Sequence, residues 1–391
     1  MSDGRRHVVV IYTDAGGGHR MTAFASKEIL EATGLYRVTL INPYKELMPH
    51  LDLLLRLSGR RSEDIYNETI LRDGRTGLYC LLYYMMVLIN FRLSAREGRR
   101  TFADYFERQR PDMVISVLPM LNRVIFDGLQ DYRMRGGGRE TARGVVLITD
   151  WAEMGRHVWF PRGRDYDAIC GTEEAHRRAA SGVVPPGRLH RTQGLLLKPA
   201  FLAGPAGDKA AARAARGLAP DRPVVCVLYG GGGSWRMRDL ALSMKDTPPD
   251  GQVVFMCGHN DALAEELRAV DWPFPARVVG FTDDVAGYLG MADVFVGKPG
   301  PGSVSEALAC GLSLLVDRTM ALPQEKPVLR WLKTSGAGRA FTGLAEFHRT
   351  LADLLGRHRT GGPPAHPNTA AAELPAIVAG ILDRDSGRHG E

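Results

Sequence analysis

The sequence is poor in cysteine and has no close cysteine pair. Its five cysteines are spread over 391 residues without a C-x-x-C spacing, which argues against a disulfide framework and against a zinc knuckle. This usage suits a reducing compartment, so we expect a cytoplasmic protein. The net charge of +6 is modest for the length, and we expect no nucleic-acid partner.

Long apolar runs are also lacking. The longest, Leu78–Ile89, is about half to two-thirds of a membrane span, so no spanning helix is predicted. An apolar run also follows Arg5 and Arg6, but it stops by Thr13 and Asp14. That run is too short for a signal peptide and is interpreted as a first strand.

What the sequence does contain is a glycine-rich stretch at residues 292–311, ADVFVGKPGPGSVSEALACG. The apolar run Val294–Val296 predicts a strand, the glycines and prolines predict a loop, and a helix then continues to Gly311. Such a loop leaves backbone N–H groups free at the positive end of a helix, where they attract phosphate.

Ser303 and Glu306 at the start of this helix allow two interpretations. They could form a capping box, in which each side chain bonds the other's backbone N–H. Alternatively, Glu306 could accept both hydroxyls of a ribose whose diphosphate lies at the helix end. The glycines in front, and the pair Gln324 and Glu325 after the next predicted strand (Leu312–Val316), favour the nucleotide interpretation.

Residues 7–33 repeat this design near the N-terminus. A strand (His7–Tyr12) leads into the loop Thr13–Gly18, and a helix is expected from about His19. His19 could be a histidine without a task, or a general base that is neutral near pH 7 and takes a proton from an attacking hydroxyl. Asp14 could orient its ring, although an Asp in such a turn is more often a local cap.

An apolar and aromatic segment precedes a basic cluster between residues 78 and 100. It could be a buried helix with a solvated basic end. It could equally be an interfacial segment whose apolar side chains enter the headgroup region while arginines bind anionic lipid phosphates. In the second case the contacts with acceptor and membrane would come from Gly17, Gly18, Tyr83, Tyr84, Arg92, Arg96, Arg99 and Arg100.

Strands and helices alternate through both halves, which predicts an α/β fold with parallel sheets and crossover helices. A strand and a turn are predicted over 38–47, and further strands near 113–117, 144–149, 167–170, 223–228, 253–256 and 277–281. An Ala/Gly/Pro-rich stretch, 204–222, is interpreted as an interdomain linker. We therefore expect one doubly wound domain over 1–203, a second over 223–360, and a last helix near 370–382.

At this point the sequence resembles a known family. TDAGGGHRMTA (13–23) resembles the N-terminal signature of monogalactosyldiacylglycerol synthases and the related processive diacylglycerol glucosyltransferases. GKPGPGSVSEALACGL with PQE (297–312 and 323–325) resembles their donor-site signature. The segments TDW…H.W (149–159), GLLLKPAF (194–201) and CGHN (257–260) fit in the same order, so the resemblance spans nearly the whole chain.

The resemblance implies an inverting glycosyltransferase of family 28 with the GT-B fold, two Rossmann-like domains facing a cleft. It implies a UDP-sugar donor (UDP-galactose or UDP-glucose), a lipid acceptor such as 1,2-diacylglycerol, and no metal or other cofactor. It also implies a peripheral association with an anionic membrane, expected here at its inner face, and a last helix that crosses back onto the first domain.

The resemblance further assigns roles to single residues. The family's base falls on His19, the ribose-binding acid on Glu306, the phosphate loop on Gly300–Ser303, the sugar-hydroxyl pair on Gln324 and Glu325, and the uracil region on the backbone near Phe281. The full set of expected donor-binding residues is Gly231, Gly232, Asn260, Phe281, Gly300, Pro301, Gly302, Ser303, Glu306, Gln324 and Glu325.

The expected mechanism is direct displacement at the anomeric carbon. His19 deprotonates the acceptor hydroxyl, while the Gly300–Ser303 helix end and the 230–233 loop stabilise the departing UDP. Asp165-Tyr166-Asp167 has the DxD form that binds Mn²⁺ or Mg²⁺ in other glycosyltransferases. It leads into a strand far from the donor motifs and is interpreted as incidental.

Two features depart from the family pattern. Lys326-Pro327-Val328 follows the Gln-Glu pair where the family usually has an Asn, and the 230–237 loop ends in the bulky Ser-Trp-Arg-Met. Both concern the donor sugar, so galactose, glucose or another hexose stays open. The same chemistry on a polyprenyl-linked or soluble acceptor, and a non-catalytic binder of nucleotide sugars or membranes, are the alternatives.

Overall fold

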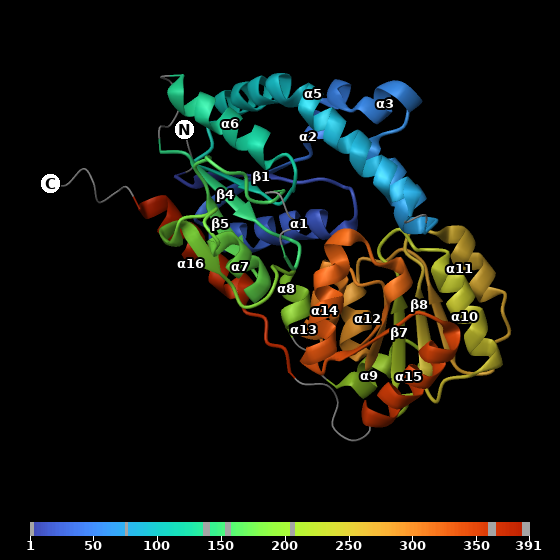
Figure 1. The fold of residues 1–391 in the computed structure, drawn as a ribbon. Helices are drawn as coiled ribbons and strands as arrows, with labels where there is room; N and C mark the ends of the chain where they lie inside the picture. Colours follow the sequence, from blue (N-terminus) through green and yellow to red (C-terminus); the bar gives the residue numbers. More distant parts are fainter. Residues whose placement is uncertain are drawn as a thin grey trace. The chain divides into compact units, whose positions relative to one another are not determined.

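The structure is a computed structural model that describes residues 4–74, 77–135, 141–152, 158–203, 208–358 and 365–384. His157, in the motif 149–159, and residues 204–207 of the expected linker lie outside these ranges. The chain divides into two compact units (Figure 1). Unit 1 comprises Met1–Ile65, Leu81–Pro199 and Asn368–Glu391, and unit 2 comprises Tyr66–Cys80 and Ala200–Pro367.

Unit 1 is built on a six-stranded parallel sheet with the order β2-β1-β3-β4-β5-β6. Its strands are β1 (Arg6–Ile11), β2 (Tyr36–Ile41), β3 (Met113–Ser116), β4 (Arg143–Leu147), β5 (Asp167–Cys170) and β6 (Leu189–Arg191). Val8 and Val10 pack into the core on one face, and Val9 and Ile11 into the core on the other. A sheet covered on both faces explains why its strands are nearly continuous apolar runs.

Helices cover both faces of this sheet. The helices of unit 1 are α1 (Gly17–Ala32), α2 (Pro43–Glu46), α3 (Leu53–Ser58), α4 (Ser62–Ile65), α5 (Leu78–Gln109, in unit 1 from Leu81), α6 (Asn122–Met134), α7 (Glu173–Ala180) and α16 (Ala370–Asp383). The C-terminal α16, red in Figure 1, packs beside α1. Its buried residues Ala370, Leu374, Val378 and Ile381 follow the helical period, which gives α16 one apolar side for this core.

Unit 2 contains a second six-stranded parallel sheet, with the order β12-β11-β10-β7-β8-β9. Its strands are β7 (Val224–Leu228), β8 (Gln252–Met256), β9 (Ala276–Val279), β10 (Val294–Gly297), β11 (Ser313–Asp317) and β12 (Gly338–Phe341). Its longer helices are α10 (Arg236–Asp246), α11 (Asp261–Arg268), α12 (Val285–Met291), α13 (Pro301–Ala309), α14 (Lys326–Ser335) and α15 (Leu344–His358). The predicted class, two doubly wound α/β domains, is confirmed. The edge strands β6 and β12 were not predicted.

The stretch expected as a linker packs onto unit 2 from Asp208 onward. It contains α9 (Lys209–Ala214), which follows the short α8 (Pro199–Leu202). Arg213 donates to Oδ2 of the fully buried Asp293 at 2.6 Å, and Lys209 Nζ lies 3.4 Å from Oδ1 of the same carboxylate. Removing one partner of an ion pair this deeply buried is strongly destabilising, because the other charge is left buried and unpaired. The pair therefore holds α9 on unit 2.

Candidate active site

In unit 1, the loops after β1, β3 and β4 leave the same edge of the sheet, where ligands bind in open α/β folds. The β1–α1 loop ends at Gly16, whose φ of 76° favours glycine. The helix α1 begins at Gly17, two residues before the predicted start. A side chain at Gly17 or Gly18 would meet no atom within 4 Å, so this helix end is open to a ligand.

His19 is the third residue of α1, and its Nδ1 lies 2.9 Å from the Thr149 hydroxyl. Its ring also lies 6.0 Å from that of the buried Trp159. Burial lowers the pKa of His19 to about 4, although a hydrogen bond to the Val117 main chain acts in the opposite direction. The imidazole is therefore neutral at pH 7 and able to accept a proton. Thr149, the first residue of the TDW motif, had not been predicted as its partner.

Asp14 has a different neighbourhood from the one expected. Its Oδ2 accepts from Lys45 Nζ at 2.6 Å, and its Oδ1 lies 3.8 Å from Arg20 Nε. The contact at Nδ1 of His19 comes from Thr149 instead. The expectation that Asp14 orients the imidazole is thus corrected: Thr149 occupies that position, and Asp14 forms ion pairs beside the loop.

Glu63 on α4 is a further polar residue at the β1–α1 loop, and the sequence offered no signal for it. Its Oε1 accepts from the Thr13 hydroxyl, from the backbone N–H of Asp14 at 2.8 Å and from Asn42 Nδ2 at 2.9 Å. Glu63 is only 3% exposed. Two of these three hydrogen bonds hold the loop that precedes His19, and the third joins it to Asn42 after β2.

The outer surface of α5 carries an apolar stripe, so the interpretation of this segment as a buried core helix is wrong. Between 42% and 74% of the surface of each of its members is exposed: Leu81, Leu82, Met85, Leu88, Ile89 and Leu93. With 3.6 residues per turn, Arg92, Arg96 and Arg100 continue the same side of the helix. Within the described residues no helix is long and apolar enough to cross a membrane.

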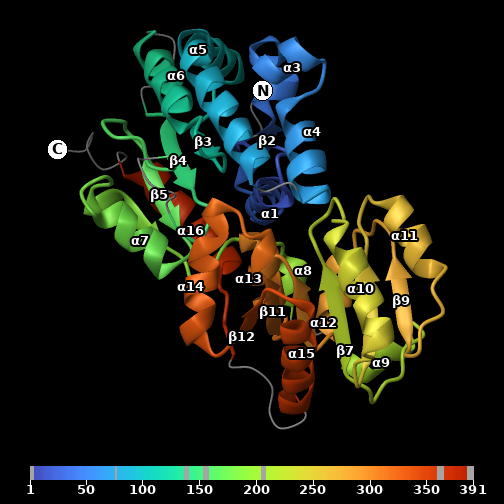
Figure 2. The same ribbon diagram turned by 45° about the vertical axis from the view of Figure 1, so that its right-hand side comes forward.

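Two of the expected membrane contacts have other surroundings. Arg99 pairs with Asp131 on the adjacent helix α6 (Figure 2), with 2.6 Å between Nε and Oδ2. Burial, together with the neighbouring Tyr84 and the carboxylates of Asp52 and Glu63, raises the pKa of Tyr83. The charge of Arg99 is therefore matched by a carboxylate, and the phenol of Tyr83 lies near the polar interior beneath α5.

In unit 2, the glycine-rich loop after β10 leads into α13, whose N-cap is Gly300. No side chain caps this helix end, and Ser303 Oγ donates to the Gly300 carbonyl at 3.3 Å. Because Ser303 is the third residue of the helix and not its N-cap, the capping-box interpretation of Ser303 and Glu306 is wrong. Pro301 and Gly302 form the first turn, and Glu306, one turn further along α13, is half-buried.

Glu325 lies beneath this loop. Its Oε1 accepts from Lys298 Nζ at 2.6 Å, its Oε2 accepts from the Leu322 N–H at 2.9 Å, and the residue is 2% exposed. A side chain at Gly300 would lie 3.5 Å from Lys298 Cε and 3.7 Å from Glu325 Oε1. The carboxylate therefore supports the loop from below, which is at odds with a direct contact to a sugar hydroxyl.

The loop after β7, residues 230–233, is held by the neighbouring loop after β8. A Cβ on Gly233 would lie 1.8 Å from the Cys257 carbonyl oxygen, so only glycine fits. Asn260 Nδ2 donates to the Gly233 carbonyl at 3.0 Å, and Asn260 Oδ1 accepts from the first turn of α11. Asn260 was expected to bind the donor, but its side chain holds the loop. Gly231 and Gly232 are exposed with open space beside them.

The bulky end of this loop has a structural reason. Arg236 Nε donates to Oδ2 of the fully buried Asp317 at 2.8 Å, and the Tyr229 hydroxyl donates to the same oxygen at 3.1 Å. These bonds join the start of α10 to the carboxyl ends of β7 and β11. At the end of β9, Phe281 is 56% exposed and stacks on His259 with 3.9 Å between the ring centroids.

The DxD sequence is occupied by ion pairs within unit 1. Asp165 pairs with Arg133 at 2.7 Å, and Asp167 pairs with His190 at 2.9 Å and with Arg384 of the C-terminal segment at 2.7 Å. In the part of the chain that the structure describes, no group of three or more His, Cys, Asp or Glu side chains could hold a metal ion.

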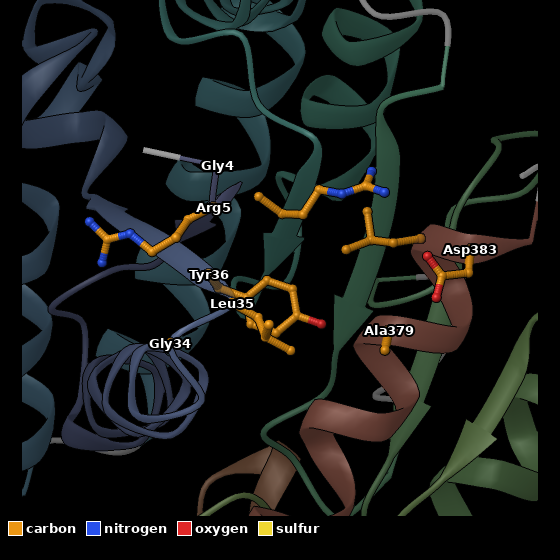
Figure 3. A pocket seen from close by; sticks show the side chains of 9 residues that line it. Gly4, Arg5, Gly34, Leu35, Tyr36, Ala379 and Asp383 are labelled. Carbon is orange, nitrogen blue, oxygen red and sulfur yellow. The ribbon is translucent and has the colours of Figure 1, made fainter. Parts of the chain in front are cut away.

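A hollow of about 470 Å³ lies elsewhere in unit 1 (Figure 3). It is lined by residues before β1, by the start of β2 and by the end of α16, including Arg5, Leu35, Tyr36 and Asp383. These are the amino ends of the strands. His19 follows the carboxyl end of β1, so the hollow is at the edge of the sheet opposite the candidate site.

The sequence is similar to known proteins over both units, although no protein-family model matches it. It is 25% identical to monogalactosyldiacylglycerol synthase 3, chloroplastic, of Arabidopsis thaliana, over 96% of this chain and 80% of that protein. It is 26% identical to the Spinacia oleracea synthase, over 90% of this chain and 66% of that protein. It is 27% identical to the probable synthase of Nicotiana tabacum, over 86% of this chain and 62% of that protein, so the chain spans less than two thirds of that relative. The resemblance seen in the motifs is confirmed.

Solved structures confirm the GT-B fold. MurG of Acinetobacter baumannii matches with a TM-score of 0.54 at 13% identity, covering 96% of this chain and 99% of that one. Spinosyn rhamnosyltransferase SpnG complexed with thymidine diphosphate matches with a TM-score of 0.53 at 14% identity, covering 98% of this chain and 100% of that one. UDP-GlcNAc 2-epimerase of Neisseria meningitidis bound to UDP-GlcNAc matches with a TM-score of 0.55 at 10% identity, covering 95% of this chain and 99% of that one. Transferases and an epimerase share this fold, so the fold alone does not select the reaction.

Proposed function

We propose that the chain, a distant relative of the monogalactosyldiacylglycerol synthases, is a glycosyltransferase of their family and transfers a hexose from a UDP-sugar to a diacylglycerol-type lipid. The observation that carries this proposal is the neutral His19. Its ring is oriented by Thr149 and lies beside the open helix end of Gly17 and Gly18. A neutral imidazole at this helix end can take the proton of an acceptor hydroxyl, which is the step that a transferase requires.

In the proposed reaction His19 takes the proton of the acceptor hydroxyl. The acceptor oxygen then forms a bond to the anomeric carbon from the side opposite the diphosphate. The bond from that carbon to the diphosphate breaks, UDP leaves with the electron pair, and the anomeric configuration inverts. A general base in this position contributes about 10²–10⁴ to the rate.

The donor is proposed to bind unit 2. The uncapped first turn of α13, from Gly300 to Ser303, would receive the diphosphate, and Glu306 would accept the ribose hydroxyls. The exposed Gly231 and Gly232 would allow a second approach of backbone to phosphate. Gln324 is the proposed sugar contact, and the exposed ring of Phe281 marks the place for the base. No metal is assigned a role.

The membrane is proposed to meet the apolar stripe of α5. Six exposed apolar side chains would enter the headgroup boundary, and Arg92, Arg96 and Arg100 would bind anionic lipid phosphates at about 1 kcal/mol each. This arrangement would bring the first unit, and with it His19, to a lipid acceptor that does not leave the bilayer.

The test is to incubate the purified protein with radiolabelled UDP-galactose or UDP-glucose and vesicles of dioleoylglycerol in phosphatidylglycerol. We expect a labelled glycolipid, identified by mass spectrometry. His19→Ala should lower kcat about 10²–10⁴-fold while UDP binding by calorimetry is retained. His176→Ala on α7 is the matched control.

Other results would favour other functions. Label on a polyprenyl-linked or soluble acceptor, but not on diacylglycerol, would keep the chemistry and change the acceptor. UDP binding without turnover of any acceptor would favour a non-catalytic binder. Near-normal turnover by His19→Ala would end the assignment of the base.

A further inference from the structure

One residue in the loop after β3 has an unusual backbone conformation. Among the described residues other than glycine, only Arg110 and Met120 have a positive φ, of 49° and 67° respectively. This conformation is uncommon for a residue with a side chain, because Cβ comes too close to a neighbouring carbonyl oxygen. It persists only where the surrounding structure imposes it, and such residues cluster at active sites and ligand clamps.

The conformation of Arg110 has an ordinary explanation. Arg110 directly follows α5, and its N–H donates to the Phe106 carbonyl at 2.7 Å. A residue in the left-handed conformation commonly ends a helix in this way. Arg110 is exposed and precedes β3, so it lies at the amino edge of the sheet, opposite the candidate site.

Met120 is not at a helix end of this kind. It is the middle residue of a three-residue turn between β3 and α6 (Figure 2), in which the Leu121 N–H donates to the Pro119 carbonyl at 2.7 Å. With a positive φ at its centre, this bond is the pattern of the classic γ-turn, which is rare and strained. The Met120 side chain is half-buried and is not part of the buried core. Core packing of this side chain therefore does not account for the strain.

The turn is fastened to the segment that carries Trp159. The Met120 N–H donates to the Val158 carbonyl at 3.0 Å, and Asn122 Nδ2 donates to the Trp159 carbonyl at 2.8 Å. The Trp159 ring lies 6.0 Å from the ring of His19. Two hydrogen bonds from the turn region therefore end on main chain whose aromatic side chain lies beside the candidate base.

The loop that contains Met120 also begins beside the base. The strands β1 and β3 are neighbours, and the Val117 N–H donates to the Ile11 carbonyl at 3.0 Å, so the loops after these strands start side by side. The Val117 main chain in turn hydrogen-bonds to the His19 imidazole. Met120 follows Val117 by three residues, and both belong to unit 1. Its half-buried side chain is thus at the same edge of the sheet as His19.

We infer that the strained turn presents the Met120 side chain to the acceptor lipid, so that Met120 contacts the apolar carbons next to the hydroxyl that His19 deprotonates. This inference rests on the proposed function and adds to it a residue that selects for an apolar acceptor. The thioether chain is unbranched and polarisable, so it adapts to flexible apolar ligands. To a polar acceptor it offers only a weak hydrogen-bond acceptor.

The first test measures steady-state kinetics with dioleoylglycerol as acceptor. Met120→Ala removes the apolar contact and should raise the acceptor KM about threefold to tenfold, with kcat near that of the wild type. Met120→Leu keeps the apolar volume and should retain the wild-type acceptor KM. Arg110→Ala, at the opposite edge of the sheet, is the matched control and should change neither constant. The Kd for UDP should be the same in all three variants, because the proposed donor site belongs to unit 2.

The second test measures the strain by thermal unfolding. Glycine adopts a positive φ without the clash of Cβ, so Met120→Gly should melt about 2–4 °C above Met120→Ala. Arg110→Gly should exceed Arg110→Ala by a similar amount. Met120→Gly should nevertheless have a raised acceptor KM, because it lacks the side chain. A variant that is more stable than Met120→Ala and still binds the lipid weakly cannot owe its defect to a damaged fold.

Three results of these tests would overturn the inference. An unchanged acceptor KM in Met120→Ala would mean that the turn only places its buried neighbours Leu118 and Leu121. A lower kcat with an unchanged acceptor KM would mean that the turn acts on His19 and not on the lipid. Equal Tm values for Met120→Gly and Met120→Ala would mean that the turn is not strained.

Hydrogen exchange tests the contact without turnover. Phosphatidylglycerol vesicles that contain dioleoylglycerol should slow amide exchange in residues 117–122 more than vesicles of phosphatidylglycerol alone. Equal exchange with both vesicles, while the wild type still forms glycolipid, would overturn the Met120 contact and leave the proposed function standing. A wild type that binds no UDP, or that glycosylates only a soluble acceptor, would overturn the proposed function itself, so the two failures are distinguishable.

Discussion

The ion pair between Lys298 and Glu325 allows a sharp test of how the donor loop is built. Glu325→Gln keeps the shape of the side chain, and its amide oxygen can still accept from the Leu322 N–H. It removes the negative charge 2.6 Å from Lys298 Nζ. The Lys298 side chain is 14% exposed, so its ammonium group would be left largely buried without a counter-charge.

The expected loss can be estimated from this burial. Removing one partner of a buried ion pair costs about 3–5 kcal/mol. For a unit of this size each kcal/mol lowers Tm by about 2–4 °C, so the melting temperature should fall on the order of 10 °C. Lys298→Met added to Glu325→Gln removes the second charge, and the double variant should return to within about 1–2 kcal/mol of the wild type.

The assay is thermal unfolding followed by circular dichroism, with the donor KM measured on the same three proteins. Since the carboxylate is occupied by Lys298 and Leu322, the donor KM of the folded double variant should stay close to that of the wild type. If Glu325→Gln melts with the wild type while its donor KM rises tenfold or more, Glu325 binds the sugar directly. In that case the ion pair does not support the loop.

Three further predictions follow from single contacts. Glu306→Gln should raise the donor KM about fivefold to thirtyfold, corresponding to about 1–2 kcal/mol for a charged hydrogen bond. The Tm should not fall, because Glu306 caps no helix end, and an unchanged donor KM would contradict ribose binding by Glu306. The pKa of His19 is lowered from 6.5 to about 4, so the stability that its neutral ring contributes is present above pH 6.5 and is lost as pH falls towards 4. Over this range the Tm of His19→Gln should fall less steeply with pH than the Tm of the wild type, and equal slopes of Tm against pH would contradict this. Replacing Arg92, Arg96 and Arg100 by Gln should abolish sedimentation with phosphatidylglycerol vesicles at moderate salt. The control Arg99→Gln should still sediment, because Arg99 already pairs with Asp131, and equal sedimentation of the triple variant and the wild type would exclude this surface as the membrane contact.

The strands and the glycine loops were predictable because their causes are local. Apolar runs such as Val224–Leu228 and Val253–Met256 predict strands of a covered sheet, and the structure has β7 and β8 there. The phosphate-type loops are recognisable from their glycines, because glycine lets a ligand or a second loop approach the backbone closely. His19 was singled out by its place directly after such a loop. Short edge strands such as β6 carry too few apolar residues to be recognised.

The partners of the site residues could not be predicted, because they are distant in the sequence. Thr149 is 130 residues from His19, Lys298 is 27 residues from Glu325, and Tyr66 is 258 residues from Gln324. A capping box and a ribose site also share one local sequence, and only the observed helix start at Pro301 separates them. Whether α5 is a core helix or a surface helix depends on what packs against it, which its own residues do not encode.

The sequence by itself thus determined the two α/β units, the positions of the three glycine loops and the identity of the candidate base. These properties follow from short-range backbone preferences and from the spacing of apolar residues. Only the tertiary structure decided that Thr149 orients His19, that Glu325 and Asn260 support loops, and that Tyr66 and Arg72 belong to unit 2. The physical reason is that a hydrogen bond or an ion pair depends on distances between atoms, and folding sets those distances between residues that the sequence keeps far apart.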